Sequence, residues 1–182
     1  IDLRPFTMPV PCNHERWEGN FNELVDDIPS RSVDVVYSLS AIEHFGLSAY
    51  RELWVNAYAD VVALDAFRRI LNPGGMVCLT VPYGAAHLDV WPHWRVYSSW
   101  STDTRLRQRL VLEAGLFFTS GPCMINGKFC DKGLIISPED AMNYCGDPPH
   151  LTAFVRLRKA DGFRLDGGVP VSSFRENMNV QL

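Results

Sequence analysis

Several features that would mark a secreted, membrane-bound or nucleic-acid-binding protein are missing from this chain of 182 residues. No apolar run approaches the ~18 residues of a membrane span, and the first residues lack the charged-then-apolar pattern of a signal peptide. Lysine and arginine form no run. The 17 basic and 21 acidic residues give a net charge of −4, whereas nucleic-acid-binding domains usually carry a basic patch. These absences predict a cytoplasmic protein with no membrane span, and they do not favour a nucleic-acid partner.

Cysteines in a metal-binding pattern are also missing. The chain has five cysteines, an odd number at wide spacings, and no Cys-x-x-Cys pair that would indicate a zinc ribbon. We therefore expect free thiols and no metal site. The pairs left open as candidate metal ligands are Cys12 with His14, and Cys123 with Cys130.

The apolar residues that are present predict strands that alternate with helices. Short β-branched runs at 33–39 and 76–81 are typical of buried strands, and helical spacing of apolar residues predicts a helix over 60–71 between them. A second helix is expected over 103–114. This order predicts an α/β fold with a mainly parallel sheet, helices on both faces, and ligands beyond the carboxyl ends of the strands. Further strands are expected at 1–6, 116–119, 134–137 and 152–159.

The order of several short motifs resembles that of the class I S-adenosylmethionine-dependent methyltransferases. Residues 34–45 read DVVYSLSAIEHF, a predicted strand that ends in small polar residues and a Glu-His pair. A predicted helix then ends at RILNPGG (69–75), and the next strand ends at LTVPYG (79–84). Each motif alone is weak, but in this order they resemble the family from residue 1 to about residue 118. The resemblance implies a Rossmann-like, doubly wound sheet.

The resemblance also implies a site for S-adenosylmethionine, with S-adenosylhomocysteine as product. Asp2 matches the acidic residue that binds the ribose hydroxyls, although a loop aspartate can also simply cap a turn. Asn20 and Phe21 match the adenine-binding segment, where the family often has Asp in place of Asn20; Phe21 alternatively belongs to the core. The cofactor-binding residues implied are Asp2, Leu3, Asn20, Phe21, Ser38, Leu39 and Ser40.

Catalytic and acceptor-binding residues follow the two central strands. His44 is a candidate general base because the pKa of histidine lies near neutral pH, and Glu43 is its candidate partner. The alternative is that the Glu-His pair only packs and positions the chain, since methyl transfer needs little beyond proximity and alignment. Aromatic rings after the second strand suit an acceptor wall and attract a sulfonium cation, or they form a hydrophobic lid. The predicted acceptor-binding residues are Tyr83, His87, Trp91, His93 and Trp94.

The Gly-x-Gly-x-Gly loop of the family, expected upstream of Asp2, is missing from the sequence. Gly74-Gly75 and Gly167-Gly168 are not placed to replace it. The resemblance therefore implies that residues 1–160 form a methyltransferase-like domain without its N-terminal strand–helix unit, and that 161–182 are an irregular tail. The predicted function is methyl transfer to a small-molecule acceptor. The alternatives are a non-catalytic binding or scaffold module that has lost the cofactor, and a less favoured NAD or nucleotide-sugar enzyme.

Overall fold

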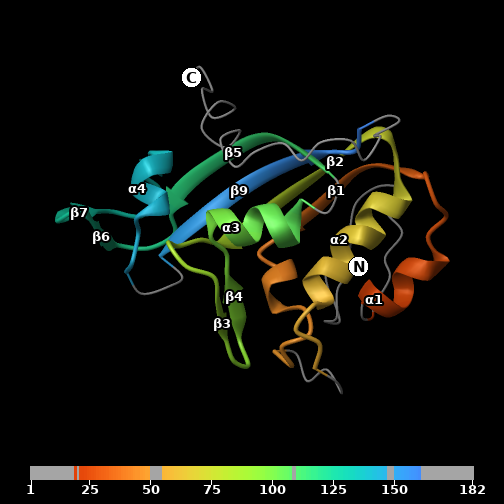
Figure 1. Cartoon of the computed structure of the whole chain (residues 1–182), viewed down its shortest axis with the longest axis horizontal. Helices are drawn as coiled ribbons and strands as arrows, with labels where there is room; N and C mark the ends of the chain where they lie inside the picture. The colour runs from red at the N-terminus through yellow and green to blue at the C-terminus, as the bar shows by residue number, and fades with distance from the viewer. Residues whose placement is uncertain (1–18, 20, 50–54, 108–109, 147–149, 161–182) are drawn as a thin grey trace, which may run out of the picture.

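A five-stranded sheet organises the fold in the computed structural model, which describes residues 19, 21–49, 55–107, 110–146 and 150–160 (Figure 1). The strand order is β1-β2-β9-β5-β8. β1 and β2 are parallel, and the other neighbouring pairs are antiparallel. The strands are β1 (Val33–Leu39), β2 (Leu71–Pro82), β5 (Val111–Thr119), β8 (Ile135–Ile136) and β9 (Leu151–Arg158).

Short helices and two antiparallel ribbons complete the described part of the chain. The ribbons pair β3 (Leu88–Val90) with β4 (Trp94–Val96), and β6 (Cys123–Ile125) with β7 (Lys128–Cys130). The helices are α1 (Phe21–Leu24), η1 (Val25–Asp27), η2 (Ile42–His44), α2 (Ala59–Ile70), α3 (Ser99–Ser101), η3 (Thr102–Leu106) and α4 (Pro138–Met142).

The predicted strand–helix–strand unit is confirmed as β1–α2–β2. Leu64, Phe67 and Ile70 are buried on one face of α2, as the helical spacing of apolar residues requires. The helix ends at Ile70 because Leu71 is extended, and the Asn72–Gly75 turn lies within β2, where the register with β1 shifts. The unit supplies one parallel pair with its carboxyl ends at the same edge of the sheet.

The expectation of a mainly parallel sheet is wrong for the second half. Residues 111–114, predicted as helix, belong to β5, which exposes Val111 and buries Leu112 in strand-like alternation. A parallel return needs a long crossover, usually a helix, but α4 is the one helix described between β5 and β9 and has only five residues. β9 therefore runs antiparallel between β2 and β5.

Helices on both faces are not seen in the described part of the chain either. α2 and α3 lie over the same face of the sheet (Figure 1). Along β9, Val155 and Leu157 are buried while Arg156 is exposed, which is the alternation of a sheet packed on one face. β1, expected to be covered on both faces, leaves Tyr37 71% and Leu39 61% exposed.

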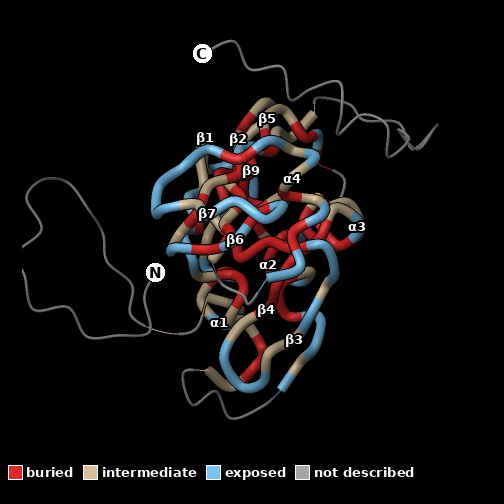
Figure 2. The backbone as a smooth tube through the Cα atoms, turned by 90° about the vertical axis from the view of Figure 1, so that its left-hand side faces the viewer, coloured by how far each residue is buried: buried red, intermediate tan, exposed pale blue. Residues whose placement is uncertain are grey.

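The core lies between the sheet and α2, and buried residues gather in the middle of the molecule (Figure 2). Leu64 and Phe67 of α2 join Val77 and Leu79 of β2 and Val155 of β9 in one cluster. No helix in the described part of the chain is long and apolar enough to cross a membrane.

Gly46 closes the segment between η2 and α2. Its φ is +71°, and its carbonyl accepts a hydrogen bond from the Asn56 amide at 3.0 Å. A Cβ added there would lie 2.2 Å from the Asn56 carbonyl oxygen and 2.6 Å from the Ala59 Cβ. The close approach of two backbones therefore requires glycine at this position.

We expect Gly46→Ala to lower the free energy of unfolding by about 2–3 kcal/mol, from the left-handed φ and the steric overlap together. Gly74→Ala is the matched control, because Gly74 has a φ of +74° with no atom within 4 Å of the added Cβ. It should show the φ penalty alone, about 1–2 kcal/mol. Urea denaturation of both variants measures the difference, and equal losses would contradict the close approach.

Candidate functional site

A strained turn follows β1 at the carboxyl end of the parallel unit. Ser40 has a φ of +47°, which is uncommon for a residue with a side chain. Its amide is held by β2, because it donates to the Thr80 carbonyl at 3.1 Å and to the Thr80 Oγ1 at 2.9 Å. Leu39 and Ser40 are exposed beside this turn. In α/β sheets ligands bind beyond these strand ends, so the turn marks the edge where a ligand is expected.

Glu43 lies in η2, directly after this turn, and is 3% exposed. Burial raises the pKa of its carboxyl from 4.5 to about 7. The Oε2 atom is buried with no hydrogen-bond partner within the described part of the chain. A carboxyl that holds or releases a proton near neutral pH is suited to acid–base chemistry or to binding a donor.

His44 joins η2 to the β3–β4 ribbon. Its Nδ1 lies 2.5 Å from the His93 carbonyl oxygen, and its Nε2 lies 3.8 Å from Glu43 Oε1. A carbonyl only accepts, so Nδ1 carries the proton in the neutral ring, and Nε2 is the proton-accepting nitrogen on the side of Glu43. The structure therefore brings together the two residues that the sequence singled out for catalysis.

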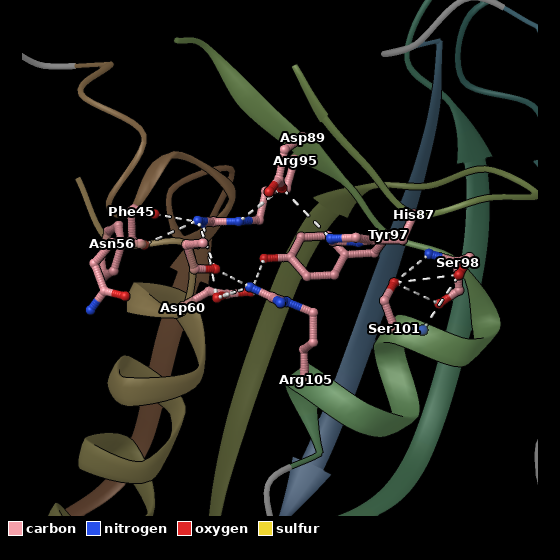
Figure 3. Close-up of polar contacts among 11 residues, drawn as sticks. Phe45, Asn56, Asp60, His87, Asp89, Arg95, Tyr97, Ser98, Ser101 and Arg105 are labelled. Atoms are coloured by element: carbon pink, nitrogen blue, oxygen red, sulfur yellow. Dashed lines mark hydrogen bonds and ion pairs between the residues drawn. The ribbon is translucent and has the colours of Figure 1, made fainter. Parts of the chain in front are cut away.

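A buried charged network lies beside η2 and centres on Asp60 (Figure 3). Asp60 is fully buried in the first turn of α2. Arg105 binds both of its carboxylate oxygens, with Nε at 2.9 Å from Oδ2 and Nη2 at 2.6 Å from Oδ1. The Tyr97 hydroxyl donates to Oδ2 at 2.9 Å, and burial together with the Asp60 carboxylate raises the pKa of Tyr97 well above its ordinary value.

Arg95 of β4 extends the network to the loop between η2 and α2. The side chain is fully buried, and its Nη1 donates to the Phe45 carbonyl at 2.5 Å. Its Nη2 donates to the Ala57 carbonyl at 3.3 Å, and its Nε lies 3.1 Å from Asp89 Oδ1. One guanidinium thus ties the chain on both sides of the loop to the β3–β4 ribbon, which fixes η2 in place.

Local structure explains how Arg105 reaches Asp60. Ser98 and Ser101 form a capping box at the start of α3, which sets the direction of the helix. The chain then widens into the π-helical turn η3, in which the Arg107 amide bonds to the Thr102 carbonyl at 3.1 Å. Arg105 lies within this turn, and such turns often occur at functional sites.

The predicted cofactor-binding residues are only partly described. Asp2, Leu3 and Asn20 lie outside the described residues. Ser38 is buried near the end of β1, and Leu39 and Ser40 are exposed there. The Phe21 ring contacts Phe67 edge to face at 4.9 Å between centroids and stacks near Phe45 at 6.1 Å, so both described contacts join it to the core.

The predicted acceptor-binding residues separate into core and surface groups. Tyr83 is buried against Phe117, and burial raises its pKa to about 12. His87 lies against Tyr97 beside the network, where burial, with Arg105 nearby, lowers its pKa. Trp91, His93 and Trp94 belong to the β3–β4 ribbon. Trp91 and His93 are exposed at its turn, and the centroids of the Trp94 and His93 rings lie 5.4 Å apart.

Asp60 itself was a sequence signal for this network, but the apolar pattern of the helix obscured it. Asp60 is at helical spacing from Leu64 and Phe67, so it lies on the buried face of α2. A charged residue on an apolar helix face needs a buried partner. Spacing along the sequence does not show which arginine reaches Asp60.

One family model matches the part of the chain that contains this site. The family described as "Caenorhabditis protein of unknown function, DUF268" matches residues 22–106, which include the whole Asp60 network and the Glu43–His44 pair. No curated protein matches the chain.

Solved structures similar to this chain include several methyltransferases. One is an S-adenosylmethionine-dependent methyltransferase from Thermotoga maritima, at 14% identity and a TM-score of 0.45, covering 79% of this chain and 62% of that one. A protein assigned as a sarcosine dimethylglycine methyltransferase from Galdieria sulphuraria shows 14% identity, a TM-score of 0.48, and coverage of 80% and 59%. A protein from Thermus thermophilus, assigned as a DNA modification methylase, shows 16% identity, a TM-score of 0.44, and coverage of 86% and 60%. The chain spans about three-fifths of the length of these structures.

Proposed function

We propose that this protein transfers a methyl group from S-adenosylmethionine to a small-molecule acceptor at the carboxyl end of β1 and β2. The observation that carries the proposal is the position of the Glu43–His44 pair. It follows the strained Ser40 turn at the end of the parallel β1–α2–β2 unit, where such sheets bind ligands.

The groups present at this edge are compatible with a polar, cationic ligand. Leu39 and Ser40 expose the end of β1, and the Glu43 Oε2 atom is a buried acceptor with no hydrogen-bond partner in the described part. A buried carboxyl of this kind favours a nearby cation or hydrogen-bond donor. The resemblance in the sequence assigns Ser38, Leu39 and Ser40 to the methionine part, and Asp2, Leu3, Asn20 and Phe21 to the ribose and adenine.

The chain's own residues would position the acceptor and accept its proton. When bound, S-adenosylmethionine supplies an electrophilic methyl group on a sulfonium centre. His44 accepts the acceptor's proton on Nε2, since Nδ1 is committed to the His93 carbonyl. Glu43 Oε1 lies 3.8 Å from Nε2, where a carboxylate would stabilise the imidazolium that forms. The proposed acceptor-binding residues are Tyr83, His87, Trp91, His93 and Trp94, and the His93 carbonyl is the contact that links this set to His44.

Isothermal titration of the full-length protein with S-adenosylmethionine and S-adenosylhomocysteine tests the proposal. We expect binding of both, and we expect Leu39→Arg to weaken it at least about tenfold by placing bulk and positive charge at the strand end. Tyr37→Arg is the matched control, because Tyr37 is exposed two residues earlier on the same face of β1.

The titration has a clear opposing outcome. If neither compound binds to the wild-type protein, the enzyme proposal fails and the scaffold alternative replaces it. If Tyr37→Arg weakens binding as much as Leu39→Arg, the ligand does not lie at the end of β1.

A further inference from the structure

Two cysteines face each other across the β6–β7 ribbon, which lies beyond the end of β5 (Figure 1). Cys123 and Cys130 are directly opposed in antiparallel register, and both thiols are free. Opposed residues in such a ribbon have Cα atoms about 4.5–5.5 Å apart. Disulfides form over Cα separations of about 4.4–6.8 Å, so the ribbon holds this pair within bonding range.

The turn of the ribbon keeps the two cysteines in register. Asn126 and Gly127 have φ values of +50° and +76°, the combination of a two-residue type I′ hairpin turn. Ile125 and Lys128 pair next to this turn, and Cys123 and Cys130 pair two positions further along. Side chains alternate along each strand, so both thiols project to the same face of the ribbon.

We propose that Cys123 and Cys130 form a reversible dithiol–disulfide site whose co-reactant is a small disulfide of the glutathione type. Cys130 is the more exposed thiol, and its thiolate attacks a sulfur of the small disulfide, releasing one small thiol. The Cys123 thiolate then attacks the Cys130 sulfur and releases the second small thiol. The protein loses two electrons and two protons, and the small disulfide gains them.

The surroundings of Cys123 slow the second step at neutral pH. Burial raises the pKa of Cys123, with Cys130 adding to the rise, so little thiolate is present at neutral pH. The step therefore speeds up as the pH rises. Oxidation also removes the Cys123 thiol from its hydrogen bond with Tyr144, whose carbonyl accepts from the Ala85 amide at 2.9 Å.

Thiol trapping after incubation in glutathione redox buffers tests the site. The full-length protein is equilibrated with oxidised and reduced glutathione, quenched with N-ethylmaleimide and mapped by mass spectrometry. We expect a peptide that links Cys123 to Cys130, formed faster at higher pH and lost on treatment with dithiothreitol. Cys123→Ala should stop at a glutathionyl group on Cys130.

Cys145→Ala is the control, because Cys145 is an exposed free thiol outside the ribbon and its loss should leave the linked peptide unchanged. Three results would overturn the proposal. They are a stable glutathionyl group on Cys130 of the wild-type protein, a linked peptide that requires Cys145, and no oxidation of either thiol.

Discussion

Replacement of Asp60 by alanine is expected to lower the free energy of unfolding by about 3–5 kcal/mol, because it leaves buried positive charge without its partner. Arg105 is partly buried and loses two hydrogen bonds, and the fully buried Arg95 loses a carboxylate oxygen 4.0 Å from its Nη1 and keeps only Asp89 as an acidic partner in the described part of the chain. Tyr97 loses the acceptor of its hydroxyl. Urea denaturation at neutral pH measures the loss, and a shift in the midpoint without a change in slope identifies it as stability.

Asp65→Ala provides the matched control on the same helix. Asp65 is 62% exposed and pairs with Arg68 at the surface, at 2.8 Å. Exposed pairs of this kind contribute about 0–1 kcal/mol, so this variant should unfold almost as the wild type does. Similar losses in the two variants would show that Asp60 is not the centre of a buried network.

Glu43→Gln should remove a large part of the pH dependence of stability between about pH 4.5 and pH 7. Burial raises the pKa of Glu43 from 4.5 to about 7, so the folded protein holds a proton that the unfolded chain has released. Stability therefore falls as the pH rises through this window. The free energy of unfolding lost across this window is on the order of 3 kcal/mol. Glutamine has no titrating proton, so the variant does not lose it.

The measurement is the difference in unfolding free energy between Glu43→Gln and the wild type, at several pH values. This difference should grow in favour of the variant from pH 4.5 to pH 7, since contributions from other titrating groups cancel. Glu139→Gln removes an exposed carboxyl and should retain the wild-type curve. A Glu43→Gln curve parallel to that of the wild type would mean that folding does not raise the pKa of Glu43.

β1 and α2 could be predicted from the sequence almost to the residue, because their signals are local, whereas β2 begins at Leu71, five residues before the predicted start. A short β-branched run, a helical apolar pattern and an Asn-Pro-Gly-Gly turn each specify one element. The helix predicted over 103–114 failed because Leu106, Leu110 and Ala114 fit helical spacing, while Leu112 and Phe117 fit a strand. Pairing with β9, forty residues later, selects the strand, and a local pattern contains no information about that pairing.

The candidate site also has a part that local sequence signals predicted and a part that they did not. Glu43 and His44 were predicted as candidates because they directly follow a recognisable strand, in a motif that resembles the methyltransferase family. The Asp60 network was not, since its members come from α2, β4 and η3 and meet only after the chain has folded. The direction of β9 in the sheet could not be predicted either. Whether a strand runs parallel or antiparallel to its neighbour depends on the length and secondary structure of the connection before it, and not on the sequence of the strand.

The backbone contact between Gly46 and Asn56 has a consequence for how the chain tolerates changes in length. It fixes the two ends of the segment that joins η2 to α2, and Arg95 holds the same ends through the Phe45 and Ala57 carbonyls. Doubling a loop whose ends are already fixed costs only about 0.6 kcal/mol of closure entropy. The Glu43–His44 pair should therefore keep its place when the length of chain between these two anchors changes, because the anchors alone set the position of η2.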